Sequence, residues 1–453
     1  MIEALRIKNY KSIVNMKLKL GRVNLIIGEN GCGKSNILEA IALSSATEDS
    51  SLKKSELVSR GVRIIDDSDL MVSNFIELED DQKSQSIEVE MFFSGDNQKN
   101  CKVSELPSSR YTITPHMEDS SYIRFKSDSV SSYQRDGKRK KILNEEITDS
   151  VISLSDVMAQ FFDLVKSNEI KIDLEDVKKS ANEYEDNALL KELSKSVSTE
   201  EFVTKAQNLA PSDETVIEAK NQKAVRQLLE HEKEKIKDFL IYSPENTALR
   251  NFYKEKQVEP LGTCGEGLLK LLKSLSKDKS AMETINKVLG LFGWYDSVTI
   301  PERLSSSEDK VYIKDKYVKD LFDQRSANEG FLFILFYVSL LVSDETPKVF
   351  AIDNIDASLN PRLCIKLMEI ITKLAEANDK QVFLTTHNPA ILDGFDIKKS
   401  SNKLIVVSRD TETGHTVQKT ISSKKNLSRA DGKPLKLSEA FLRGYFGGLP
   451  KEF

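Results

Sequence analysis

The stretch from Gly28 to Ser35 has the residue types and the spacing of a phosphate-binding loop. It reads Gly-Glu-Asn-Gly-Cys-Gly-Lys-Ser and fits the pattern G-x-x-x-x-G-K-[ST]. Glycines let the backbone approach a phosphate group and turn several N–H groups towards it. We expect Lys34 to reach the β- and γ-phosphates of a nucleotide and the Ser35 hydroxyl to bind Mg²⁺. The residues predicted to contact the nucleotide here are Asn30, Gly31, Cys32, Gly33, Lys34, Ser35 and Asn36.

The residues on either side of this phosphate loop favour the arrangement that its chemistry needs. Residues 22–27 are mostly apolar and predict a short buried strand, and residues 36–43 have the spacing of a helix. The N-terminus of such a helix carries a partial positive charge, which stabilises phosphate groups. Strand, glycine-rich turn and helix together predict a nucleotide site rather than an ordinary turn.

A second part of the same site is predicted more than three hundred residues further along the chain. Residues 348–353 form an apolar run ending in Asp353, and residues 381–386 form another that ends at His387, with a helix predicted between them. A carboxylate at the end of a buried strand has the form of a Walker B element, so Asp353 and Ser35 are the predicted metal ligands. Strands alternating with helices imply a parallel sheet with phosphate chemistry at its carboxyl edge. The expected fold class is an α/β P-loop NTPase.

The glycine content, the charge and the spacing of apolar residues change twice along the chain, which predicts three segments. Residues 1–130 contain the phosphate loop and alternating segments, such as 87–93, that predict antiparallel strands. Residues 131–238 contain one glycine, Gly137, and have many charges and helical spacing. We therefore expect a helical insertion that splits the nucleotide-binding core. Residues 239–453 would complete the core.

Composition excludes several classes of protein. The formal net charge of −5 over 453 residues argues against a chain that coats nucleic acid through bulk charge. The basic cluster at residues 135–141 leaves two interpretations open, a solvated loop or a local nucleic-acid contact. Four cysteines without a C-x-x-C pair indicate neither a zinc site nor a disulfide framework. The start lacks a signal-peptide core and the apolar run at residues 331–342 is too short to span a bilayer, so we expect a cytoplasmic protein with no membrane contact.

Further motifs carry a family resemblance. Residues 5–12, the phosphate loop, residues 353–361 and residues 385–389 resemble the ABC-type ATPases of the SMC, RecF and overcoming-lysogenization-defect group. Residues 442–450 are typical of its compact prokaryotic relatives, often described as AAA-family ATPases. The resemblance covers both ends of the chain but not the insertion. It implies an ABC-type core, split in sequence, with ATP and Mg²⁺ as ligands.

The resemblance also implies that ATP is held between two copies of the chain. In this family a signature motif from the partner subunit touches the γ-phosphate, and residues 325–331 match it, with Asn328 where the family usually has Ser. An amide can still donate to a phosphate oxygen. Ser326 and Glu329 also match a capping box, and both readings can hold because a capped helix N-terminus can contact a phosphate. By the same resemblance, the nucleotide-contacting residues include Lys11, Asn328, Glu329 and Gly330.

Asn354 departs from the family pattern. The family usually has Glu directly after the Walker B Asp, and that Glu polarises the attacking water, while His387 matches the switch histidine that senses the γ-phosphate. An amide cannot take a proton as a carboxylate can, and loss of a general base costs about 10²–10⁴ in rate. We therefore predict tight ATP binding and slow hydrolysis, with Asp353, Asn354 and His387 around the reacting phosphate.

Asp356 leaves two interpretations open. It lies two residues beyond Asn354, where its carboxylate is a substitute base acting through a water molecule. Its position also predicts a dimer-contact loop together with Ser358 and Asn360.

Among the compact relatives, the chain is most similar to the PtuA family, the ATPase subunits of Septu and certain retron antiphage systems. The AriA family of the PARIS system is second. The similarity rests on chain length, on the Asp353-Asn354 pair, on residues 243–246 and on the absence of an attached nuclease pattern. It implies a homo-oligomeric scaffold that regulates a separate nuclease, of the HNH type by the first likeness and of the Toprim type by the second. The alternative is a RecF- or SMC-like ATPase of DNA repair or chromosome maintenance that clamps DNA itself.

Overall fold

Contacts along the chain divide it into two units, residues 1–131 with 231–453 and residues 132–230. The computed structural model describes residues 1–47, 51–64, 70–75, 86–94, 102–119, 122–135, 138–142, 213–251, 261–300, 310–421 and 435–447, with the single positions 155, 159 and 204. The first unit contains both predicted halves of the nucleotide site. The second contains most of the predicted insertion, and its larger part lies outside the described residues.

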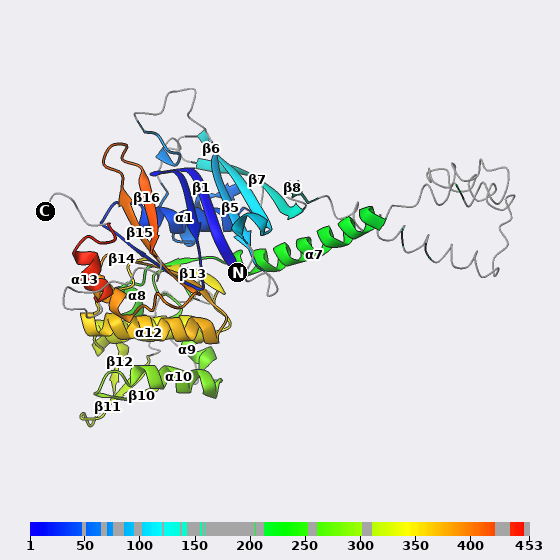
Figure 1. The fold of residues 1–453 in the computed structure, drawn as a ribbon. Coiled ribbons are helices and arrows are strands. Elements are labelled where there is room, and N and C mark those ends of the chain that lie inside the picture. The colour runs from blue at the N-terminus through cyan, green and yellow to red at the C-terminus, as the bar shows by residue number, and fades with distance from the viewer. Residues whose placement is uncertain are drawn as a thin grey trace, which may run out of the picture. The chain divides into compact units, whose positions relative to one another are not determined.

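A six-stranded, mostly parallel sheet positions the predicted site (Figure 1). Its order is β16-β15-β3-β14-β13-β9, and only β16 runs antiparallel to its neighbour. All residues of β3, β13 and β14 are buried, as expected for strands covered on both faces. The predicted parallel sheet and P-loop NTPase fold are therefore confirmed. The strands are β3 (Val23–Ile27), β9 (Ile241–Tyr242), β13 (Val349–Ile352), β14 (Gln381–Thr386), β15 (Asn402–Arg409) and β16 (Thr416–Ile421).

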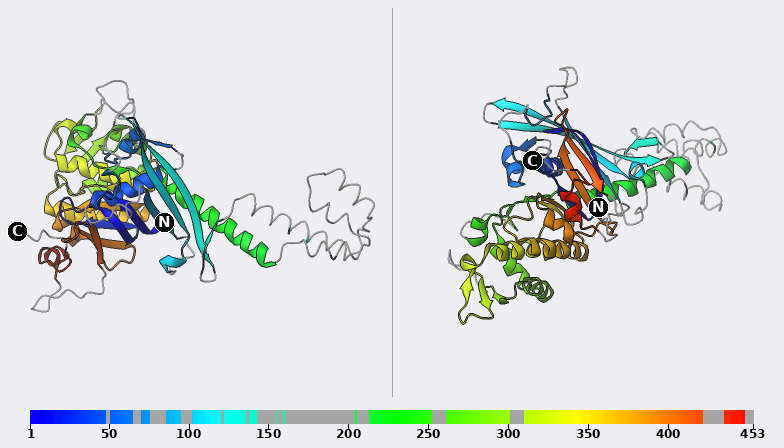
Figure 2. Two further views of the ribbon diagram at one scale, coloured as in Figure 1. Left: turned by 90° about the horizontal axis from the view of Figure 1, so that it is seen from above. Right: turned by 60° about the vertical axis from the view of Figure 1, so that its left-hand side comes forward.

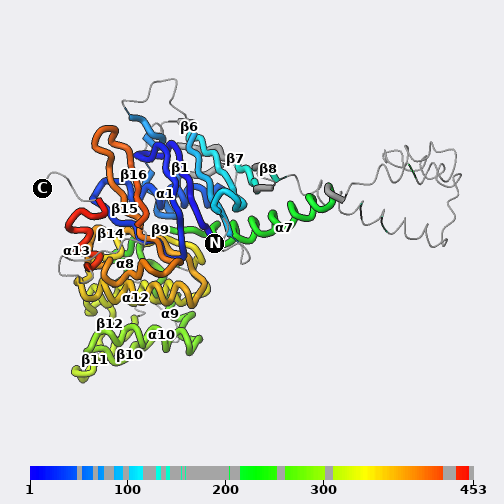
Figure 3. The backbone as a smooth tube through the Cα atoms, in the orientation of Figure 1, coloured from blue at the N-terminus to red at the C-terminus, as the bar shows by residue number. Residues whose placement is uncertain are grey.

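Strands from the two ends of the sequence lie side by side in this sheet. β15 pairs in parallel with β3, so residues near position 405 lie beside residues near position 25, as the blue and orange segments of Figure 3 show. β3 also pairs with β14 on its other side. The phosphate loop therefore leaves the middle of the sheet, and the residues that follow β13 and β14 leave the same carboxyl edge.

A second, seven-stranded sheet forms most of the N-terminal part. Its strands follow the order β2-β1-β5-β6-β7-β4, with β8 paired to β7, and the long strands β6 and β7 are neighbours (Figure 2). The pairings confirm the predicted antiparallel strands. The strands are β1 (Ile2–Tyr10), β2 (Ile13–Lys19), β4 (Ser51–Lys53), β5 (Ile87–Phe93), β6 (Ser108–Asp119), β7 (Tyr122–Arg135) and β8 (Lys138–Lys141).

Helix α1 (Lys34–Ser45) contacts strands of both sheets, which explains why nearly all of its residues are buried. Helix α11 (Glu329–Val342) is likewise buried almost throughout, among four other helices. Those helices are α8 (Asn246–Arg250), α9 (Leu268–Leu275), α10 (Lys279–Leu289) and α12 (Pro361–Ala377). The other elements among the described residues of this unit are α2 (Lys54–Ser59), η4 (Val103–Glu105), β10 (Tyr295–Thr299), β11 (Tyr312–Asp315), β12 (Phe322–Asp323), η6 (Gln324–Ser326), η7 (Pro389–Gly394) and α13 (Leu437–Leu442).

Arg135 and residues 138–141 of the basic cluster lie in paired strands, so the interpretation as a loop is wrong for these residues. Arg135 pairs with Lys138 and Ser132 pairs with Lys141 across β7 and β8. Within the second unit Lys140 forms an ion pair of 2.9 Å with Glu218 of α7 (Asp213–Ile236). The boundaries at residues 131 and 238 remain predictions.

Lys380 is a fully buried lysine at the amino end of β14. Its Nζ donates to the carbonyl oxygens of Leu340 at 2.9 Å and Ser343 at 2.6 Å, and to the hydroxyl of Thr346. Leu340 lies in the last turn of α11, and Ser343 and Thr346 follow that helix, so the ammonium ties the C-terminal end of α11 to the sheet. Burial lowers the pKa of Lys380 to about 7 from its usual 10.5; the positive charge of Lys348 adds to this shift, and the negative charge of Asp344 opposes it.

We expect Lys380→Met to lower the free energy of unfolding by about 1–3 kcal/mol, because buried acceptors lose their donor. The difference should grow between about pH 7 and pH 10. In that window the unfolded lysine holds a proton that the folded one releases, so the wild type gains stability as pH rises. Urea denaturation at pH 7 and pH 9 measures both effects. Lys366→Met is the control, since Lys366 is an exposed lysine that pairs with Glu369 of the same helix, α12; an equal loss in both variants would contradict the prediction.

Candidate functional site

The phosphate loop runs from the end of β3 into α1, as predicted. Gly33 has a φ of 100° and precedes the helix directly. A Cβ atom at this position would lie 2.4 Å from the hydroxyl of Thr416 and 2.9 Å from that of Ser12. At Gly28 a Cβ atom would lie 2.0 Å from the carbonyl oxygen of Val407. Both glycines are therefore required by the close approach of neighbouring strands.

Lys34 is held by the carbonyl groups of its own loop. Its Nζ donates to Gly28 at 2.9 Å and to Glu29 at 2.8 Å, and the residue is 7% exposed. The ammonium thus lies inside the loop that is predicted to surround the β- and γ-phosphates. The thiol of Cys32 is fully buried in the same loop, and burial raises its pKa, so it fills space as a neutral group.

The two predicted metal ligands meet across the sheet. The Ser35 hydroxyl donates to Oδ2 of Asp353 at 2.9 Å, although the two residues are 318 positions apart. The Thr385 hydroxyl donates to the other oxygen of Asp353 and accepts the N–H of Asn354 at 2.9 Å. A hydroxyl and a carboxylate are the oxygen ligands that Mg²⁺ takes, and this ion usually completes its shell with phosphates and water. The pair therefore fits a nucleotide-bound Mg²⁺.

Asn354 and His387 follow β13 and β14 at the same edge. Asn354 is exposed and has a φ of 55°, a left-handed conformation that asparagine tolerates. The side chain of His387 is 54% exposed, and its Nε2 lies 3.7 Å from Oδ2 of Asp356. Asp356 itself is 7% exposed and accepts from the Thr386 hydroxyl at 2.6 Å. The Asp356 carboxylate is therefore buried against Thr386 and His387. An attacking water would contact the exposed side chains of Asn354 and His387 instead.

Lys11 is tied to a carboxylate that sequence reasoning missed. Its Nζ lies 2.6 Å from Glu39 of α1, and burial lowers its pKa. The same buried Glu39 accepts from Arg63 at 2.7 Å and from the hydroxyl of Tyr10 at 3.2 Å. Glu39 is the charged residue within the otherwise apolar run of residues 37–43, and that pattern is the sequence signal for it. Arg409, whose Nε donates to the carbonyl of Gly31 at 3.2 Å, has no comparable signal.

The predicted signature residues begin α11. Asn328 is the N-cap, and its Oδ1 accepts the N–H of Phe331 at 2.8 Å. The capping box predicted from Ser326 is wrong, because Ser326 belongs to the short helix η6 before it. The Glu329 carboxylate accepts from Ser358 at 2.5 Å. In the described part of the chain, no hydrogen bond or ion pair joins residues 328–330 to the phosphate loop of the same copy.

Removing the cap should weaken the start of α11. We expect Asn328→Ala to lower the free energy of unfolding by about 1 kcal/mol and Asn328→Ser to leave it nearly unchanged, since both Asn and Ser accept at the N-cap. Chemical denaturation of the three proteins measures this. A loss of equal size in the Ser variant would show that the amide is needed for more than the cap.

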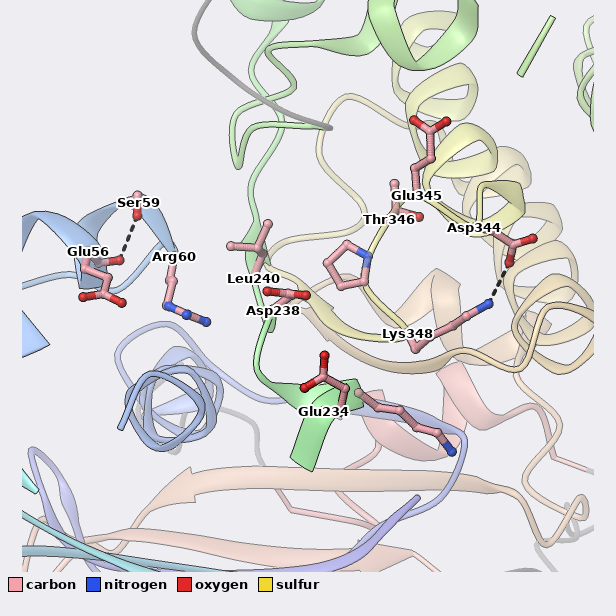
Figure 4. Close-up of a pocket in the computed structure, with 12 residues that line it drawn as sticks. Glu56, Ser59, Arg60, Glu234, Asp238, Leu240, Asp344, Glu345, Thr346 and Lys348 are labelled. Atoms are coloured by element: carbon pink, nitrogen blue, oxygen red, sulfur yellow. Dashed lines mark hydrogen bonds and ion pairs between the residues drawn. The ribbon is translucent and has the colours of Figure 1, made fainter. Parts of the chain in front are cut away.

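A hollow of about 420 Å³ lies at the opposite edge of the sheet, before β9 and β13 (Figure 4). Its three cations already have partners: Lys348 pairs with Asp344, Lys235 with Glu232, and Arg60 donates to the carbonyl of Lys237. Five carboxylates outnumber these cations, so the hollow is unsuited to a triphosphate. It is lined by Glu56, Ser59, Arg60, Glu234, Lys235, Asp238, Leu240, Asp344, Glu345, Thr346, Pro347 and Lys348.

The helices of the described ranges contain no segment that is both long and apolar enough to cross a bilayer.

Comparisons with known proteins agree with this geometry. A family model for the AAA ATPase domain matches residues 1–392, which include the phosphate loop, Asp353 and His387. An uncharacterized protein of Methanocaldococcus jannaschii is 52% identical over 44 residues, which is 10% of this chain and 20% of that protein. The chain thus matches about a fifth of the length of this curated relative.

Two solved structures are similar over most of their length. One is the Smc head domain of Pyrococcus furiosus with an extended coiled coil, bound to the C-terminal domain of ScpA, at 17% identity, a TM-score of 0.43 and coverage of 94% of this chain and 97% of that chain. The other is the SMC head domain of Thermotoga maritima, at 12% identity, a TM-score of 0.41 and coverage of 93% and 99%. Identities and scores this low carry no inference about activity.

Proposed function

The chain belongs to the AAA ATPase domain family, and from this premise we propose that it is a slowly hydrolysing ATP-binding scaffold. It would assemble with copies of itself and regulate a separate nuclease in antiphage defence. Asn354 is the observation that carries the proposal. It stands beside a complete set of binding residues, Lys34, Ser35 and Asp353, at the position where a carboxylate would activate water. Such a site binds ATP firmly and turns it over slowly.

Two observations support assembly through ATP sites that are shared between two copies of the chain. Among the described residues, no hydrogen bond or ion pair joins the signature residues 328–330 to the phosphate loop of their own copy, so a second copy is free to supply this contact. The turn between β11 and β12, directly before the signature, also exposes apolar side chains. Tyr317 is 83% exposed, Val318 49% and Leu321 51%, and association with another copy would cover them.

The nuclease partner is proposed from the likeness to the PtuA family, which favours the HNH type, with the Toprim type second. The likeness rests on the Asp353-Asn354 pair and on residues 243–246, which follow β9. In this proposal ATP binding fixes the oligomer, and infection changes the state in which the nuclease is held.

A DNA clamp is the second candidate, and the β7–β8 hairpin favours it. Arg139 and Lys141 are exposed there. If they contact phosphates, replacing both by Ala should weaken DNA binding uniformly across sequences and reduce its salt dependence by about two phosphate contacts.

Mass determination of the tagged complex, expressed from its native operon with and without ATP, tests the proposal. A stoichiometric nuclease in a defined oligomer is the expected result. A bare ATP-dependent dimer that retains DNA would contradict it and favour the clamp. The Arg139→Ala, Lys141→Ala variant is the matched control, because it should lose DNA but keep a bound nuclease.

A further inference from the structure

Asp356 and His387 form a carboxylate–imidazole pair next to the predicted metal ligands. Oδ1 of Asp356 accepts from the Thr386 hydroxyl at 2.6 Å, and Oδ2 faces Nε2 of His387 at 3.7 Å. The Thr386 hydroxyl also accepts the N–H of Asn388 at 2.9 Å, so the carboxylate is fixed to the end of β14. Thr385, one residue earlier, holds Asp353. Two consecutive hydroxyl groups thus fix the metal carboxylate and the carboxylate that faces the imidazole.

The burial of this pair is unequal. Asp356 is 7% exposed, whereas the His387 side chain is 54% exposed, so solvent and ligands reach the imidazole and not the carboxylate. Asp356 makes no ion pair with a lysine or arginine among the described residues. Its remaining neighbours include Cys364 and Tyr337, and its negative charge helps to raise the pKa of both, after burial. The imidazole is therefore the group through which this buried carboxylate acts on the site.

A carboxylate facing one ring nitrogen selects the tautomer of a histidine. With the proton on Nε2 towards Asp356, Nδ1 remains as the acceptor of the ring. The separation of 3.7 Å is longer than a hydrogen bond, and contacts of this kind shorten when a substrate is bound.

We propose that Asp356 is the positioning residue of His387, and that this pair accepts the water proton that Asn354 cannot take. The inference rests on the proposed ATPase function. In the step, water oxygen bonds to the γ-phosphorus as the bond between that phosphorus and its bridging oxygen breaks, giving ADP and phosphate. The water proton passes to Nδ1 of His387 and then to the released phosphate or solvent. His387 is the catalytic residue, and Asp356 acts through it.

Single-turnover and steady-state ATP hydrolysis by the full chain test this assignment. We expect Asp356→Asn to lower kcat at least tenfold while the Kd for ATP changes less than threefold, because the carboxylate touches the imidazole and not the nucleotide. His387→Ala should lower kcat by at least as much. Asp356→Glu should recover part of the rate, which a purely steric role of the side chain would not produce. Asp344→Asn is the matched control, since Asp344 is an exposed carboxylate at the opposite edge of the sheet.

Asp356→Asn made in the Asn354→Glu variant tests whether Asp356 positions His387 or only supports the fold. With a carboxylate restored at position 354, Asp356→Asn should change kcat less than threefold, because the new Glu takes the proton. An equal loss in both backgrounds, or no loss in either, overturns the inference. ATP binding without turnover in the wild type and in Asn354→Glu also overturns it and leaves the ATP-bound scaffold intact. Absence of ATP binding overturns the proposed function and the inference together.

Discussion

Asn354→Glu is expected to raise the rate of ATP hydrolysis by about 10²–10⁴, the usual contribution of a positioned general base. The side chain at this position is exposed at the carboxyl edge of the sheet, next to Asp353. A carboxylate here would accept the water proton directly and make the route through His387 unnecessary. Phosphate release from purified wild type and variant at saturating ATP measures the change.

Asn354→Gln is the matched control, because it has the length of Glu without its charge. It should hydrolyse ATP as slowly as the wild type. The left-handed φ of 55° costs a residue with a longer side chain about 1–2 kcal/mol, and Glu and Gln share this cost. A Glu variant no faster than the Gln variant would refute the view that position 354 limits turnover.

The binding half of the site could be predicted from the sequence because its parts are local. The phosphate loop is eight consecutive residues whose glycines and lysine have fixed roles, and the runs ending at Asp353 and His387 are apolar enough to predict buried strands. Parallel pairing of β3, β14 and β13 then brings their carboxyl ends together. The hydrogen bond between Ser35 and Asp353 is the consequence of that topology.

Contacts chosen by tertiary packing could not be predicted in the same way. Ser326 and Asn328 are both good N-caps, and sequence spacing alone favoured Ser326. In the structure Asp323 accepts from the N–H of Arg325 and starts the short helix η6, which leaves Asn328 to cap α11. The same limit applies to Asp356, which shows no sign in the sequence that its carboxylate would turn inward to Thr386.

Glu39 illustrates a second limit. Burying an unpaired carboxylate in α1 would cost free energy of folding. The positive charges of Lys11, which precedes the helix in the sequence, and Arg63, which follows it, compensate the charge of Glu39. The ion pairs explain why Lys11, predicted as a nucleotide contact, is occupied by its own chain in the structure described. Its contact with ATP remains a prediction, since a bound phosphate would have to compete with Glu39.

Lys34→Ala should lower the affinity for ATP by about 10²–10³. The lysine is predicted to donate to the β- and γ-phosphates, and two charge-assisted hydrogen bonds contribute about 3–4 kcal/mol together, at 1.4 kcal/mol for each factor of ten. In the free chain the same ammonium holds the carbonyl groups of Gly28 and Glu29, so thermal unfolding without nucleotide must be measured beside binding. ATP at about 100 times its Kd should stabilise the wild type by about 2.7 kcal/mol and the variant by much less. Lys54→Ala, at the start of α2, is the control, and ATP stabilisation of equal size in Lys34→Ala would show that the phosphates bind elsewhere.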